Sequence, residues 1–91
     1  MRTINMSRAF VFLNCDIGAE PAIIGEMNKI AGVSEIAQVS GIYDIVAKVN
    51  EESKESVTRL VKQIRGIDNV RSSLTMIVAE DPVKHPPGIK G

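Results

Sequence analysis

The sequence contains one pattern twice, and this internal repeat restricts the chain to few folds. A shift of 34 positions carries residues 9–40 forward and places apolar positions on apolar positions. The matched pairs are Val11 with Ile45, Leu13 with Ala47, Cys15 with Val49, Ile23 with Val57, Met27 with Val61 and Ile30 with Ile64. Each copy reads strand, helix, glycine, strand, with the glycines at Gly32 and Gly66. The repeat therefore predicts one small domain made of two βαβ units.

Composition limits the classes of function that the chain can have. Eleven basic and eleven acidic residues cancel, whereas a nucleic-acid-binding surface usually shows a basic excess. The aromatic side chains are Phe10, Phe12 and Tyr43, and they do not alternate with basic residues as a base-stacking surface requires. No apolar run is long enough to span a membrane, and the amino terminus lacks the apolar stretch of a signal peptide. We therefore expect a soluble, cytoplasmic protein without nucleic-acid or membrane contacts.

The segment boundaries follow from turn and cap residues. We expect a leader over 1–7, a domain over 8–80 and an extended or mobile, proline-rich tail over 81–91. The predicted strands span 8–16, 33–40, 42–50 and 69–79, with a tight turn at Ser40-Gly41. Pro21 suits the first turn of the first helix, and either Asn50 or Ser53 caps the start of the second. Gly32 and Gly66 are expected to end the two helices in a left-handed conformation.

Both faces of the predicted sheet are apolar. The repeat turns Val11, Leu13, Cys15 and their counterparts in the second copy toward the helices. The opposite face carries Phe10, Phe12, Ile42 and Val46, and its polar residues are only Asn14, Asp44 and Lys48. Such a face needs a cover, so we predict a homodimer packed sheet on sheet, with Phe10, Phe12 and Val46 in the interface. The alternative is a cover by the tail, which offers only Val83 and Ile89.

Few side chains are candidates for chemistry. Cys15 lies on the same face of its strand as the core positions Val11 and Leu13, which indicates a buried structural thiol. Because it is the single cysteine of the sequence, an internal disulfide is excluded. His85 has no second histidine or cysteine with which to hold a metal, so we predict neither a metal site nor a catalytic group. Asp44 either caps the turn after Gly41 or shapes a polar site at a subunit boundary. Ser72, Ser73 and Thr75 form a second polar cluster, and spacing alone favours an ordinary structural role for both clusters.

Four segments together resemble a known family. They are Ile30-Ala31-Gly32-Val33, Gly41-Ile42-Tyr43-Asp44-Ile45-Val46, Ile64-Arg65-Gly66-Ile67 and Leu74-Thr75-Met76-Ile77-Val78. They are similar to the effector-binding (RAM) domain of Lrp/AsnC transcriptional regulators, over roughly residues 8–80. The resemblance implies a ferredoxin-like α+β fold, βαββαβ, whose four-stranded antiparallel sheet carries two helices on one face. It also implies dimers formed through the other face, which assemble into higher oligomers.

The resemblance also implies a site for a small amino-acid effector at the boundary between dimers, without a cofactor. Gly41, Ile42 and Tyr43 would offer backbone groups to the ligand, and Asp44 would hold the loop or pair with the ammonium. Ser73 and Thr75 would add hydroxyls from a neighbouring subunit. Met76, Ile77 and Val78 would line the cleft or the assembly contact.

We expect no counterpart of the family's DNA-reading helix-turn-helix, because only seven residues precede the first predicted strand. We therefore expect a stand-alone module of transcription regulation that binds an effector and oligomerises, alone or together with full-length Lrp/AsnC regulators. Two alternatives remain open, an amino-acid sensor domain of a metabolic enzyme and a small ferredoxin-like enzyme. An acylphosphatase-like enzyme needs an arginine-bearing phosphate loop, and the first loop, 16–20, contains no arginine.

Overall fold

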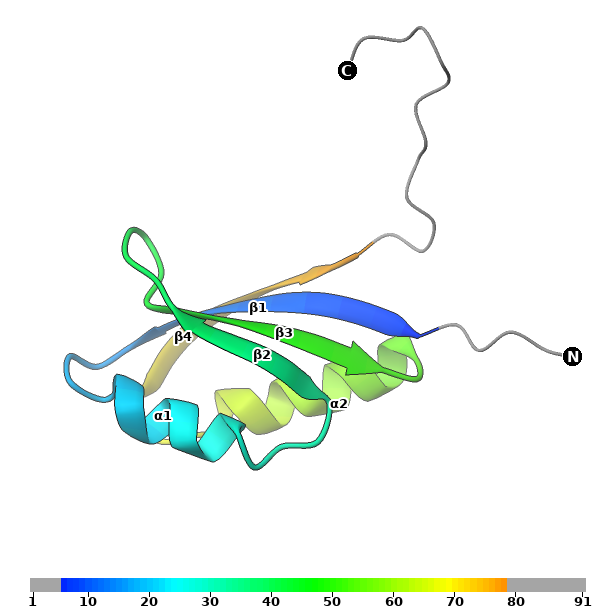
Figure 1. Cartoon of the computed structure of the whole chain (residues 1–91), viewed down its shortest axis with the longest axis horizontal. Helices are drawn as coiled ribbons and strands as arrows, with labels where there is room; N and C mark the ends of the chain where they lie inside the picture. The colour runs from blue at the N-terminus through cyan, green and yellow to red at the C-terminus, as the bar shows by residue number, and fades with distance from the viewer. Residues whose placement is uncertain (1–5, 79–91) are drawn as a thin grey trace, which may run out of the picture.

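The computed structural model describes residues 6–78. The elements are β1 (Ser7–Cys15), α1 (Glu20–Met27), β2 (Val33–Gln38), β3 (Ile45–Glu51), α2 (Lys54–Arg65) and β4 (Val70–Ile77). The strands form one sheet in the order β2-β3-β1-β4, and all neighbouring pairs are antiparallel. Both helices lie on one face of this sheet (Figure 1). The structure therefore confirms the ferredoxin-like α+β fold.

The two copies of the repeat interleave in space. The first strands of the copies, β1 and β3, are neighbours at the centre of the sheet, whereas β2 and β4 lie at its edges. Each βαβ unit is therefore split by a strand of the other unit. Neither copy contains the complete sheet, so the two copies fold as one domain.

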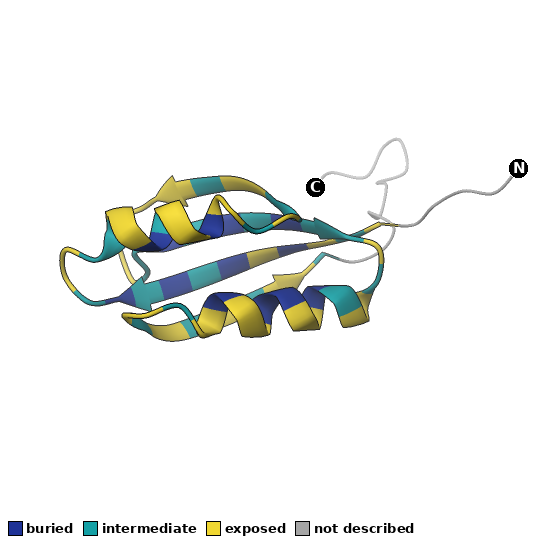
Figure 2. Ribbon diagram, turned by 90° about the horizontal axis from the view of Figure 1, so that it is seen from below, coloured by how far each residue is buried: buried dark blue, intermediate teal, exposed yellow. Residues whose placement is uncertain are grey.

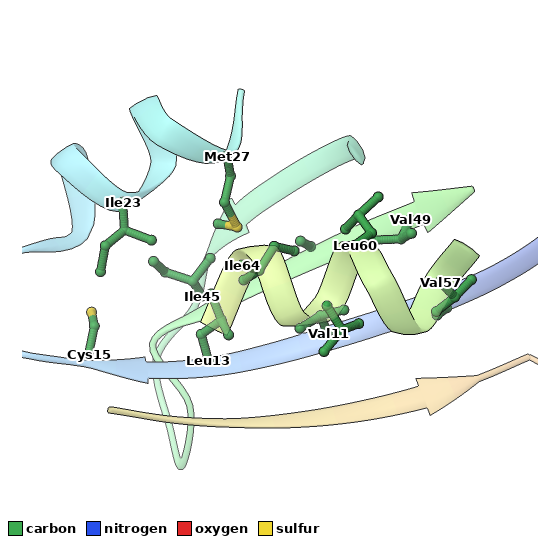
Figure 3. Packing of buried hydrophobic residues seen from close by; sticks show 13 residues of the cluster. Val11, Leu13, Cys15, Ile23, Met27, Ile45, Val49, Val57, Leu60 and Ile64 are labelled. Carbon is green, nitrogen blue, oxygen red and sulfur yellow. The ribbon is translucent and has the colours of Figure 1, made fainter. Parts of the chain in front are cut away.

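The core lies between the sheet and the helices (Figure 3). Alternate residues of the two central strands point into it, because side chains of a strand alternate between faces. The buried residues are Ala9, Val11, Leu13, Cys15, Ile23, Met27, Ile45, Ala47, Val49, Val57, Leu60, Val61 and Ile64. Along each helix, buried residues alternate with exposed ones (Figure 2), and the buried ones belong to this core. The predicted orientation of both central strands is thus confirmed.

The helix starts follow the cap chemistry of the sequence. The Ser53 hydroxyl accepts a hydrogen bond from the Ser56 N–H at 3.1 Å, which satisfies one of the unpaired donors at the start of α2. Ser53, rather than Asn50, is therefore the N-cap. Pro21 lies in the first turn of α1, as predicted.

The predicted glycine cap is wrong at Gly32, and at Gly66 it is right in position but not in conformation. Helix α1 ends at Met27, and its C-cap is Asn28 with φ −62°. Gly32 lies beyond the helix with φ +100° and contacts the side chains of Glu51 and Leu60 so closely that a Cβ would not fit. Gly66 does cap α2, but with φ −83° in the right-handed region.

The third strand is shorter than predicted. It begins at Ile45 rather than residue 42, because Val39 and Asp44 pair through their backbones and close a loop between β2 and β3. Ile42 consequently lies in this loop and not on the sheet face where the alternation placed it.

Candidate functional site

Residues 39–44 form the β2–β3 loop, whose base is tied to the end of the central strand. The Val39 N–H donates to the Asp44 carbonyl at 2.9 Å, and the Asp44 N–H donates to the Leu13 carbonyl at 2.9 Å. The Asp44 carboxylate accepts a further hydrogen bond from the Cys15 N–H, with Oδ2 at 3.0 Å. Asp44 therefore fixes the base of the loop to β1 through both its backbone and its side chain. This is the turn-capping role that the sequence offered as one of two readings.

The tip of the same loop is exposed. Residues 40–43 make no hydrogen bond to another residue in the described part of the chain, and Ile42 is 84% exposed. Gly41 has φ +138°, a conformation that glycine adopts without strain. The loop thus combines a fixed base with backbone donors and acceptors that are available at its tip.

Tyr43 connects the loop to the sheet face that the helices leave uncovered. Its ring lies 5.5 Å from the ring of Phe12, with the two planes tilted by 48°, a geometry typical of stabilising aromatic pairs. Tyr43 is half-buried in this contact. The loop and the uncovered face are therefore one continuous surface.

This uncovered face of the sheet, the open face, carries an apolar patch. Phe12 is paired with Val46 on one side and Leu74 on the other, and Phe10 is paired with Lys48 and Met76. We call the apolar members the open-face patch: Phe10, Phe12, Val46, Leu74 and Met76. Phe10 is 37% exposed, Leu74 45% and Met76 53%. Leu74 was missing from the predicted interface, although the register of β4 on β1 places it beside Phe12.

The predicted ligand residues of β4 divide between the two faces. Ser73, Thr75 and Ile77 pair with Leu13, Val11 and Ala9, whose side chains are in the core, so all three face the helix layer. Met76 instead lies on the open face. Val78 follows the strand, and its N–H donates to the Arg8 carbonyl at 2.8 Å.

The fold brings only some of these residues together within one subunit. Ser73 pairs with Leu13, the residue whose carbonyl accepts the Asp44 N–H, so Ser73 and the β2–β3 loop share one end of the sheet. Thr75, Ile77 and Val78 follow Ser73 along β4 toward the other end. A ligand at the loop would meet these residues only from another subunit.

Cys15 lies at the same end of the sheet and is buried. Burial raises the pKa of its thiol, and the nearby carboxylates of Glu20, Asp44 and Asp16 raise it further. A raised pKa keeps the thiol protonated at neutral pH and suppresses its nucleophilicity. The predicted structural role of this cysteine is thereby supported.

The helical side of residues 6–78 is grooved. One groove, of 730 Å³, runs between the carboxyl ends of the helices and is lined by residues such as Lys29, Lys62 and Asp68. Another groove, of 280 Å³, lies between α2 and β4. Sequence patterns revealed neither groove, because both arise from the packing of elements distant in the chain.

Over residues 6–78, no three histidine, cysteine, aspartate or glutamate side chains are grouped so that they could hold a metal ion. His85 lies outside this range. None of the helices within it has the length and apolar character needed to cross a membrane.

Comparison with known proteins adds a family and several relatives. A family model described as the Lrp/AsnC ligand-binding domain matches residues 8–88. Homocitrate synthase of Saccharolobus islandicus is 31% identical over 71 residues, which are 77% of this chain but 15% of the enzyme. The chain thus spans only a small part of the curated relatives that it matches.

Two solved structures show the same fold. TTHA0845 from Thermus thermophilus aligns with a TM-score of 0.79 and 24% identity, over 86% of this chain and 99% of that one. The transcriptional regulator NMB0573 from Neisseria meningitidis, solved as an L-Met complex, aligns with a TM-score of 0.75 and 14% identity, over 92% of this chain and 56% of that one.

Proposed function

Because the chain belongs to the family of Lrp/AsnC ligand-binding domains, we propose that it binds a small amino acid at the β2–β3 loop and assembles through its open face. The observation that supports this proposal is the loop itself. Asp44 fixes its base to β1, and the backbone groups of its tip have no partner among residues 6–78. In this reading the protein is a regulatory effector-binding module of the cytoplasm, and its ligand adjusts its assembly.

An amino acid suits such a loop because its head group carries both charges. Backbone N–H groups of Gly41, Ile42 and Tyr43 would meet the carboxylate, and carbonyl groups would meet the ammonium. Asp44 would hold the loop in shape while adding negative charge near the ammonium. Ser73 and Thr75 of a neighbouring subunit would complete the site, with Met76, Ile77 and Val78 at the assembly contact. The L-Met complex of the Neisseria regulator supports an amino acid as the ligand class.

The open-face patch supports the dimer. Full burial of a large apolar side chain contributes about 1.5–3 kcal/mol. In the single chain, roughly half of the surface is still exposed on each of Phe10, Leu74 and Met76, so about half of this stabilisation is available to an interface. Together with Phe12 and Val46, these side chains would contribute about 4 kcal/mol per subunit on this scale. Two subunits would then offset much of the entropy cost of association.

Thermal unfolding against each common amino acid tests the ligand claim. A ligand at a hundred times its dissociation constant stabilises the fold by about 2.7 kcal/mol, which raises the Tm of so small a domain by about 10–20 °C. In Gly41→Val the side chain strains the backbone of the tip, and this variant should lose the shift. Lys54→Gln, an exposed change at the start of α2 and near the opposite end of the sheet, where Glu51 pairs with Ser7, should keep it. If no amino acid shifts the wild type, the ligand proposal is wrong.

A second candidate function is a regulatory domain that acts on a biosynthetic enzyme. The match to a segment of homocitrate synthase supports it. Native mass spectrometry of the tagged chain purified from its source cells separates the two roles. Co-purified full-length Lrp/AsnC regulators would support a role in transcription, including mixed oligomers, whereas a co-purified enzyme would favour the second candidate.

A further inference from the structure

Tyr43 lies where the β2–β3 loop and the open-face patch meet. Its backbone belongs to the exposed tip of the loop, next to Ile42, which is 84% exposed. Its ring lies against Phe12 of the patch, with 5.5 Å between the ring centroids and a tilt of 48°. One residue therefore offers its backbone to the proposed ligand and its side chain to the proposed dimer contact.

The ring of Tyr43 extends the row of apolar side chains around Phe12. Phe12 is paired with Val46 on one side and with Leu74 on the other, and paired residues on one face of a sheet are direct neighbours. Tyr43 adjoins this row and is half-buried, so part of it is still exposed in the single chain. A partner sheet that covers Phe12 also reaches the exposed part of the Tyr43 ring.

Asp44 fixes the chain immediately after Tyr43. Its N–H donates to the Leu13 carbonyl at 2.9 Å, and its carboxylate accepts from the Cys15 N–H at 3.0 Å. The place of the Tyr43 ring over β1 is then set by the torsions of Tyr43 itself. Side-chain rotamers depend on the φ and ψ of their own residue. A contact that fixes the backbone of the tip consequently restricts the ring, and a contact on the ring restricts the backbone.

We propose that Tyr43 is the positioning residue through which a ligand on the loop tip strengthens the dimer, because its ring is buried in the open-face interface. This inference rests on the proposed function and deepens it by naming the coupling residue and the direction of the effect. Coupling between two binding events is reciprocal, so dimer formation also tightens ligand binding. The ordering of Tyr43 then opposes only the first of the two events, and ordering the backbone of one residue corresponds to about a tenfold change in an equilibrium constant.

The wild-type chain carries its own probe of the interface. Tyr43 is the single tyrosine, and the sequence contains no tryptophan, so tyrosine fluorescence reports on this residue alone. Quenching by acrylamide should decrease as the protein concentration rises through the dimer transition that sedimentation equilibrium measures. In Leu74→Ala, which weakens the dimer, this decrease should move to higher concentration together with the transition.

A double-mutant cycle measures the coupling without any ligand. In Gly41→Val the backbone at φ +138° is strained, although a Cβ at this position meets no other atom within 4 Å. Relief of this strain displaces Tyr43 and should raise the dimer dissociation constant by up to about tenfold. Tyr43→Ala also weakens the dimer, but Gly41→Val should add nothing further in that background. In a Tyr43→Phe background, which retains the ring, Gly41→Val should have its full effect.

The amino-acid panel gives the direction of the coupling. The amino acid with the largest rise in Tm should lower the dimer dissociation constant about tenfold in the wild type and in Tyr43→Phe, but not in Tyr43→Ala. Calorimetry should still detect this amino acid on Tyr43→Ala, because alanine retains the backbone groups of the tip. Lys54→Gln serves as the control and should match the wild type throughout. Circular dichroism confirms the fold of every variant.

Three results would overturn this proposal. They are acrylamide quenching that stays constant through the dimer transition, an equal effect of Gly41→Val with and without the Tyr43 ring, and a bound amino acid that leaves the wild-type dimer constant unchanged. A wild type that stays monomeric would also overturn it, while leaving the ligand proposal intact. If no amino acid binds, the proposed ligand function fails, and the quenching and the cycle still decide the role of Tyr43.

Discussion

Truncation of Leu74 to alanine should weaken the dimer without unfolding the subunit. Leu74 lies on the open face beside Phe12, and 45% of it is exposed in the single chain. Sheet-on-sheet packing would cover this remaining surface. The variant therefore removes apolar area that only the assembled state buries.

The size of the effect follows from that exposed fraction. Complete burial of a leucine is worth about 2 kcal/mol, so covering just under half of it contributes roughly 1 kcal/mol per subunit. Each dimer contains the residue twice, which gives about 2 kcal/mol for Leu74→Ala. Since about 1.4 kcal/mol corresponds to a factor of ten, the dissociation constant should rise roughly 30-fold.

Ile17 provides a control outside the open face. It is exposed in the turn between β1 and α1, where no assembly contact is proposed. Sedimentation equilibrium over a dilution series should show weaker association for Leu74→Ala and an unchanged constant for Ile17→Ala. Equal effects of the two variants, or none from Leu74→Ala, would refute assembly through the open face.

Three further perturbations probe the subunit. Asp44→Ala removes the bond to the Cys15 N–H and should lower the free energy of unfolding by about 1–2 kcal/mol in urea titration; an unchanged value would show that the bond does not anchor the loop. Gly32→Ala places a Cβ at φ +100° against Leu60 and Glu51 and should cost about 2–4 kcal/mol, whereas Gly25→Ala, where space is open, should not destabilise. The raised pKa of Cys15 gives a stability contribution that is complete below the ordinary thiol value of 9.0 and is lost as pH rises through the raised value. Wild type minus Cys15→Ala, measured between neutral and alkaline pH, should therefore decline, and a flat difference would contradict the assignment.

The periodicity of the sequence determines most of the fold. Alternation in the two central strands identified their buried faces, since a slip of one residue would expose the whole apolar set. The repeat also located both helices. It failed at Gly32, because α1 ends at Met27 and the chain then passes close to Glu51 and Leu60. Spacing does not encode such a long-range contact.

The candidate site was less accessible from the sequence. The resemblance identified the β2–β3 loop, but alternation alone extended the third strand to residue 42 and missed the backbone pairing of Val39 with Asp44. Alternation places Ser73 and Met76 on opposite faces, but which of the two faces the helices required the register of β4 on β1. Whether these residues meet around a ligand depends on contacts between subunits and stays a prediction.

The pairing of Ala9 with Ile77 has a consequence for how such a domain can be joined to other protein sequences. The chain enters through β1 and leaves through β4, which are antiparallel neighbours, so entry and exit lie side by side at one end of the sheet. The β2–β3 loop is anchored to Leu13 and Cys15, at the opposite end. New sequence joined directly before β1 or after β4 would therefore begin at the end of the sheet opposite the loop. The domain is thus suited to recombination as a portable cassette, in keeping with its likeness to one segment of a much longer enzyme.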